Sequence, residues 1–258
     1  MPKLKNMLMD VRKILLFVFI CTTSNISLAD TTPILPQSGI ISDVSDKLEI
    51  SIENSQIILE LPYIYIPPDL FPDSLKKIKE LTIHKDFYFA FADDKPNRHG
   101  NFNAVITSKG DKESLQEILL ENGLALAYFI ENTKNNKIIF NAEQKARNSK
   151  KGIWQHTNTL KSSAIINDYK EDLGEFAIVE GKPKHIYISK KNTFINFGDD
   201  WKTDFSIEFE NKLLKKSTDF SAKDLIGKTI RVRGWLEDYN GPFMKIFTVA
   251  NVEIIGDK

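Results

Sequence analysis

The amino-acid sequence predicts an α+β protein, mainly β, in which two strand-rich blocks follow one another along 258 residues. That length suits one or two domains of ordinary size. The first block mixes short runs rich in Ile, Leu and Tyr with three helical patterns. The second block has several short strand patterns with glycine turns and one helical pattern, which is typical of a small closed barrel. Residues 156–174 are polar and without periodicity, so we place a linker there.

The first 29 residues have the three parts of a secretory signal peptide. The basic head contains Lys3, Lys5, Arg12 and Lys13. An apolar run at 14–20 follows, and small residues stand at 27 and 29. Because this run is well below the roughly 20 residues that span a bilayer, we expect cleavage, no remaining membrane span and a periplasmic or secreted protein. An uncleaved amphipathic anchor is the alternative.

The first block, residues 30–155, is expected to begin with an exposed lead-in at 30–45. Residues 46–66 predict a two-stranded hairpin with a turn at Glu53, Asn54 and Ser55. The remaining patterns predict helices at 74–81, 114–122 and 135–150 and strands at 84–92 and 101–107.

The second block, residues 175–258, is expected to contain mainly strands. The predicted strands are 176–180, 185–189, 194–197, 205–209, 229–235, 244–249 and 252–255. A single helix is predicted at 221–226, between the fourth and fifth of these strands.

Charge is balanced over the chain, with 35 Lys and Arg residues against 35 Asp and Glu. Removal of the leader takes away its basic head, which leaves residues 30–174 acidic and residues 175–258 close to neutral. This balance excludes a protein that coats nucleic acid by charge alone. We expect any contact with a polyanion to be local, in the second block, and sensitive to salt.

Four pieces of the first block occur in the order seen in the staphylococcal nuclease (thermonuclease) family. They are DKPNRHGNFNAVI at 94–106, LQEILLENGLA at 115–125, EQKA at 143–146 and KGIW at 151–154. On these motifs the first block resembles that family. The second block resembles the OB-type domain that often follows such a nuclease domain in exported bacterial proteins, on FINFGDDWKTDF at 194–205 and GKTIRVRGWL at 227–236. The resemblance implies two OB-type barrels in tandem.

The resemblance also implies phosphodiester cleavage with Ca²⁺ held by carboxylates and two arginines that neutralise the phosphoryl oxygens. Laid on this chain without gaps, a calcium-binding aspartate falls on Asp46, and the two arginines become Glu60 and Asn101. The family's D-T-P-E tetrad becomes YIPP at 65–68. Only Asp46 matches, and one carboxylate is a poor cage for an ion that takes six to eight oxygen ligands. We therefore predict a catalytically degenerate protein without a cofactor.

An active enzyme with a rearranged site is the alternative. Asp69 lies one residue beyond the family's glutamate position, and Arg98 lies three residues before Asn101. A shifted loop would place Asp46, Asp69 and Arg98 around one Ca²⁺ ion and a phosphate, with Asp46 as the metal ligand. Otherwise Asp46 is an ordinary turn carboxylate.

The strand pattern at 229–236 places Arg231, Arg233 and Trp235 on one face. Arginines and an aromatic ring on one face can hold phosphates and stack a base, which predicts contact with single-stranded nucleic acid. In the alternative interpretation, Trp235 packs on a neighbouring helix and the arginines pair with acids such as Asp238.

Together these observations predict an exported thermonuclease-like protein that has lost catalysis and acts as a nucleic-acid-binding or interaction module. The expected partner is single-stranded nucleic acid, bound weakly. Two other functions stay open: an active metal-dependent endonuclease, and an envelope scaffold that binds another protein. The acidic first block is compatible with the scaffold.

Overall fold

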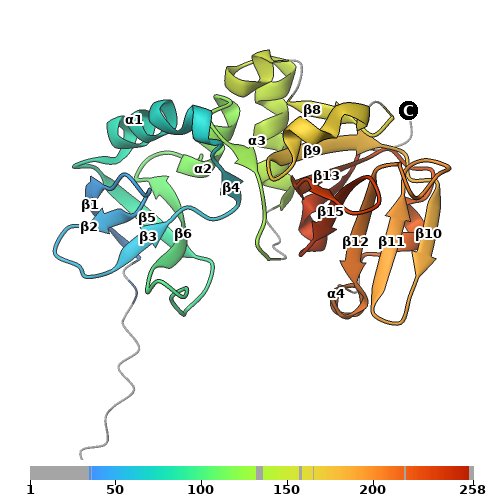
Figure 1. The fold of residues 1–258 in the computed structure, drawn as a ribbon. Helices are drawn as coiled ribbons and strands as arrows, with labels where there is room; N and C mark the ends of the chain where they lie inside the picture. Colours follow the sequence, from blue (N-terminus) through green and yellow to red (C-terminus); the bar gives the residue numbers. More distant parts are fainter. Residues whose placement is uncertain are drawn as a thin grey trace, which may run out of the picture. The chain divides into compact units, whose positions relative to one another are not determined.

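Five short strands near the N-terminus close into a barrel in the computed structural model (Figure 1). The structure describes residues 35, 37–131, 136–156, 159–164, 166–217 and 219–255, so the predicted signal peptide lies outside it. In barrel order the strands are β1 (Ser38–Val44), β2 (Ile50–Ile52), β3 (Ile58–Glu60), β6 (Phe102–Ser108) and β5 (Asp86–Phe91). Strands β3 and β6 run parallel, and the other described pairs are antiparallel. The barrel predicted for the first block is confirmed.

Strand β1 lies where the sequence predicts an exposed lead-in. Its side chains Ile41 and Val44 are fully buried, three positions apart, whereas a regular strand buries every second residue. The pairing of β1 with β2 shifts register between Ile41 and Asp43. This bulge adds one residue and hides the alternation from the sequence pattern.

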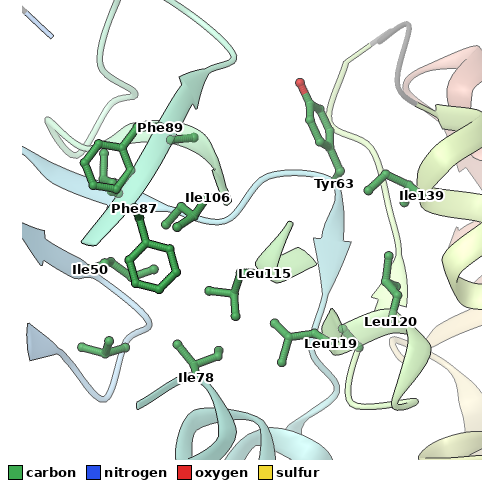
Figure 2. Close-up of a cluster of buried hydrophobic side chains, with 14 of the residues drawn as sticks. Ile50, Tyr63, Ile78, Phe87, Phe89, Ile106, Leu115, Leu119, Leu120 and Ile139 are labelled. Carbon is green, nitrogen blue, oxygen red and sulfur yellow. The ribbon is translucent and has the colours of Figure 1, made fainter. Parts of the chain in front are cut away.

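The barrel is filled by side chains from its strands and from the helices that cover it (Figure 2). On β5, Phe87 and Phe89 point inward, while Tyr88 between them is exposed. Ile78 of α1 (Phe71–Thr82) and Leu119 of α2 (Leu115–Glu121) belong to the same buried cluster. Burying each such side chain stabilises the fold by about 1.5–3 kcal/mol.

Among its described residues, the first block has five further elements, of which α3 is the longest and packs against α2. They are β4 (Ile64–Tyr65), η1 (Pro68–Leu70), β7 (Leu126–Ala127), α3 (Asn136–Asn148) and η2 (Gly152–Gln155). Helix α2 begins at a reciprocal cap in which Ser114 accepts from the Glu117 N–H and the Glu117 carboxylate accepts from the Ser114 N–H. All three helices predicted in the first block are present.

Two of the motifs that carry the resemblance meet in one tight backbone contact. Gly123 ends α2 with φ of +65°, and Gly152 begins η2 with φ of +52°. A Cβ on Gly123 would lie 2.2 Å from the Lys151 carbonyl oxygen, and one on Gly152 would lie 2.3 Å from the Gly123 oxygen. Only glycine fits either place, because the chain is left-handed and the facing atoms are backbone.

The second block forms two sheets. One has the order β10 (His185–Ile188), β11 (Asn192–Asn196), β12 (Ser206–Glu210), β15 (Pro242–Ile246) and β14 (Glu237–Asp238). The other has the order β16 (Val252–Ile254), β13 (Ile230–Trp235), β9 (Phe176–Gly181) and β8 (Leu160–Ser162). The sequence predicts a closed barrel here, whereas the described residues form two separate sheets. Pro183 separates β9 from β10 and lacks the N–H that would extend the ladder.

The segment 156–174, predicted as a linker without pattern, contains β8 and the 3-10 helix η3 (Ile166–Asp172). Strand β8 pairs in parallel with β9. Three residues are too few to show a period, so the sequence does not reveal this strand. The short elements α4 (Asn211–Lys216), η4 (Ala222–Leu225) and η5 (Val249–Asn251) complete the second block. Within the described ranges, no helix is long and apolar enough to cross a membrane.

Candidate functional site

The nuclease-like barrel carries Asp46 in the turn between β1 and β2. Its side chain is 92% exposed, and its nearest cation is Lys79 Nζ at 3.9 Å. An ion pair this open to water contributes at most about 1 kcal/mol. In this place Asp46 has the surroundings of an ordinary turn carboxylate, as in the alternative interpretation.

The two positions where the resemblance expects arginines, Glu60 and Asn101, are joined by a hydrogen bond. Asn101 Nδ2 donates to Glu60 Oε1 at 2.7 Å and to Glu49 Oε1 at 3.3 Å. Asn97 Nδ2 donates to Glu60 Oε2 at 3.0 Å, and its own Oδ1 accepts from the Asn101 and His99 N–H groups. The end of β3 and the loop before β6 are therefore tied together by neutral amides and carboxylates.

This cluster is negative. It contains the carboxylates of Glu49 and Glu60, and no ion pair among the described residues involves either of them. Asn101 is buried, so its amide is committed to these acceptors. An approaching phosphate would meet like charge where the family mechanism needs two cations.

The rearranged site with Asp46, Asp69 and Arg98 is not assembled in the described residues. Asp69 is exposed on η1, and Arg98 is exposed in the loop before β6, where its Nε lies 3.0 Å from His99 Nε2. No hydrogen bond or ion pair joins these three side chains in the parts of the chain that the structure describes. Their contribution to catalysis stays a prediction.

The donor set does not fit Ca²⁺. In the described ranges, no three His, Cys, Asp or Glu side chains come together in a way that could hold a metal ion. Calcium needs six to eight oxygen ligands, and Asp46 offers one carboxylate that faces water and a lysine. The described residues around Asp46 therefore do not form a calcium site.

Arg231 and Arg233 on β13 share one face, as the alternation predicts, but that face is covered by α3. The Arg233 side chain is fully buried; its Nη1 donates to Glu143 Oε2 at 2.9 Å and its Nη2 to Glu253 Oε2 at 3.2 Å. Arg231 Nε donates to Glu180 Oε2 at 2.7 Å. The arginines thus pair with acids, as the alternative interpretation expects, although with other acids than Asp238.

Arg147 extends this cluster on α3. Its Nη2 donates to Glu143 Oε2 at 2.7 Å, and its guanidinium lies 4.6 Å from the Trp154 ring centroid. Burial lowers the pKa of Arg147, Glu143 acts in the opposite sense, and the nearby Arg231 and Arg233 lower it further. Together with Glu143, Glu180 and Glu253, the three arginines form what we call the α3–β13 ion-pair cluster.

Trp235 at the end of β13 lies among aromatic rings. Its ring centroid is 5.0 Å from Tyr128, 5.5 Å from Phe176 and 5.8 Å from Tyr65, each edge to face. Burial raises the pKa of Tyr128. Edge-to-face contacts add about 0.5–1.5 kcal/mol per pair beyond the area they bury, so this ring has a packing role.

A basic hollow that sequence reasoning missed lies in the second block. It has a volume of about 680 Å³ and is lined by Lys190, Lys191, Asn192, Glu210, Asn211, Lys212, Lys215, Lys216 and Lys245. We call it the lysine groove. The paired lysines at 190–191 and 215–216 could have indicated this basic site. The net charge of the whole block hides them, because acidic residues elsewhere in the block balance their charge.

Comparison of the chain with curated proteins gave no match. Comparison with family models gave a match to the staphylococcal nuclease homologue family over residues 72–156. The matched span runs from α1 through η2 and contains the Gly123–Gly152 contact and Asn101. It begins after Asp46, Glu60 and Asp69. Residues 72–156 are therefore a domain of the staphylococcal nuclease family.

Proposed function

We propose that this protein is a binding module built on a nuclease fold and that its nuclease-like domain does not cleave phosphodiesters. The observation that carries the proposal is the hydrogen bond between Asn101 and Glu60, 2.7 Å long, at the two positions where the resemblance expects arginines. An arginine on a transferring phosphoryl group is worth about 10³–10⁵ in rate in other phosphoryl-transfer enzymes. A carboxylate in its place opposes the charge that develops.

The extent of the family match supports the same conclusion. Residues 72–156 cover the helices and the strand pair β5–β6, whereas the segment that would supply calcium ligands and the first arginine precedes them. At the positions where the resemblance expects arginines, the polar side chains hydrogen-bond to one another and to their neighbours.

The OB-type assignment of the second block is part of this proposal. Its pairings follow those of the barrel: β9 with β13 corresponds to β1 with β5, and the parallel pair β12–β15 corresponds to β3–β6. In both cases a helix comes after the first strand of the parallel pair, α1 after β3 and α4 after β12. OB-type domains commonly bind single strands. We further propose that the protein is exported, on its basic head and short apolar run.

Nuclease assays test this function directly. The purified protein, incubated with single- and double-stranded DNA and RNA in Ca²⁺, is expected to leave all four substrates intact, because its donors fit neither the ion nor the phosphate. Product is followed by gel electrophoresis, with a chelator as the blank. Metal-dependent cleavage that Asp46→Ala abolishes and Asp43→Ala retains would establish the endonuclease alternative. Neither cleavage nor binding at low salt would favour the envelope scaffold.

A further inference from the structure

The lysine groove concentrates positive charge in a block that is nearly neutral overall. Six lysines line it against one glutamate, Glu210. Lys245 lies 3.6 Å from Glu210 and 3.9 Å from Glu208. The other five lysines make no ion pair or side-chain hydrogen bond with any residue that the structure describes, and all five are exposed. Their ammonium groups are therefore available to an anionic ligand.

Hydrogen bonds hold the two lysine-bearing segments against each other. Asn211, the first residue of α4, donates from Nδ2 to the Ser189 oxygen at 2.9 Å and from its backbone N–H to the Lys191 oxygen at 2.8 Å. Its Oδ1 accepts from Thr193 Oγ1 at 2.7 Å. The turn between β10 and β11 and the start of α4 are thus locked together before any ligand arrives. A preformed arrangement lowers the entropic cost of binding.

Aromatic rings lie on the sheet beside the groove. Tyr187, Phe194, Glu208 and Lys245 are successive partners across β10, β11, β12 and β15, so their side chains share one face. The Tyr187 and Phe194 ring centroids are 6.4 Å apart, and the Tyr187 side chain is 68% exposed. Lys245 Nζ lies 5.6 Å from the centroid of Phe247, which is 60% exposed.

We infer that the lysine groove binds the phosphate backbone of single-stranded nucleic acid, with bases stacking on the exposed aromatic rings of the same face. Lysines that follow a backbone, combined with aromatic platforms for the bases, are the recurring design of proteins that bind single strands without sequence preference. In a duplex the bases stack on one another and cannot reach these rings.

This inference rests on nucleic acid as the ligand class of the proposed function, but it moves the binding site. The site lies in the second block, outside the matched residues 72–156. It does not include Arg231 or Arg233, whose guanidinium groups are paired with glutamates. A site in the second block also agrees with the acidic charge of the first block, because a polyanion would bind at the lysines and not at the acidic domain.

The test compares two triple variants of equal charge. Lys191, Lys212 and Lys215 are changed to Gln in the groove variant, and the exposed Lys182, Lys202 and Lys223 of the same block in the control. Affinity for a fluorescein-labelled mixed-sequence single strand is measured by anisotropy in chelator, at several salt concentrations. We expect the groove variant to bind roughly tenfold more weakly at moderate salt. The magnitude of its slope of log K against log salt should fall by about 2. The control variant should keep nearly the affinity and the slope of the parent protein. Glu210→Gln is expected to strengthen binding.

Circular dichroism melts check that each variant is folded, as expected for exposed lysines. Equal losses in both triple variants, or no binding by the parent protein at low salt, would overturn the inference. If the protein binds phosphatidylglycerol vesicles more tightly than the single strand, the ligand of the groove is a lipid surface and not nucleic acid. Cleavage in Ca²⁺ would overturn the proposed lack of catalysis without touching the groove, because the anisotropy experiment contains chelator.

Discussion

Replacement of Glu143 by alanine is expected to destabilise the protein by about 3–5 kcal/mol, because it leaves the buried charge of Arg233 without its closest partner. Glu143 is fully buried, accepts from Arg233 and Arg147, and also accepts from the Ala127 N–H at 2.8 Å. Equilibrium unfolding in urea, followed by far-ultraviolet circular dichroism, measures the loss.

An exposed ion pair supplies the control for Glu143. Asp86 pairs with Lys109 at the surface, and Asp86→Ala is expected to cost at most about 1 kcal/mol. The double variant Glu143→Leu with Arg233→Met should recover part of the loss, since apolar side chains of similar volume often replace buried pairs at little cost. If Glu143→Ala and Asp86→Ala lower the free energy of unfolding by similar amounts, the α3–β13 ion-pair cluster stabilises the fold no more than an exposed ion pair does.

Replacement of Gly123 by alanine is expected to be almost as damaging. A side chain in the left-handed conformation costs about 1–2 kcal/mol, and displacement of the Lys151 carbonyl, 2.2 Å from the new Cβ, adds about 1–3 kcal/mol. The expected result is a lower midpoint in urea, because the backbone contact between the end of α2 and η2 must open.

Gly227→Ala separates the two causes. Gly227 has a φ of +77°, close to that of Gly123, but nothing lies within 4 Å of the Cβ it would gain. It should therefore show the conformational cost alone. If Gly123→Ala and Gly227→Ala lose the same stability, the contact with Lys151 does not constrain the fold.

Much of the fold followed from local patterns, and the exceptions have physical causes. Strand β5 was predictable because Phe87 and Phe89 alternate with an exposed Tyr88. Strand β1 was not, because its bulge between Ile41 and Asp43 breaks the period that reveals a strand. Closure of the second block could not be judged either, since a strand pattern shows which side faces inward and does not show which edges pair.

The same limit explains the candidate site. Alternation placed Arg231 and Arg233 on one face correctly, but only the tertiary structure shows that α3 covers this face with Glu143. The lysine groove was hidden for another reason. Its lysines are spread from residue 190 to residue 245, and hydrogen bonds of Asn211 hold two of the segments that carry them together. The spacing of the lysines in the sequence does not predict these hydrogen bonds.

The aromatic cluster around Trp235 gives the protein a built-in optical reporter. Of its three tryptophans, Trp154 is buried under the Arg147 guanidinium, Trp235 lies among three rings with 38% of its surface exposed, and Trp201 is 60% exposed. Emission from Trp235 depends on whether β13 keeps its aromatic contacts with Tyr65, Tyr128 and Phe176. Emission from Trp154 depends on whether the Arg147 guanidinium of α3 stays on its ring. The colour of the intrinsic fluorescence therefore distinguishes a molecule that has opened at this contact from one in which only a distant loop has moved.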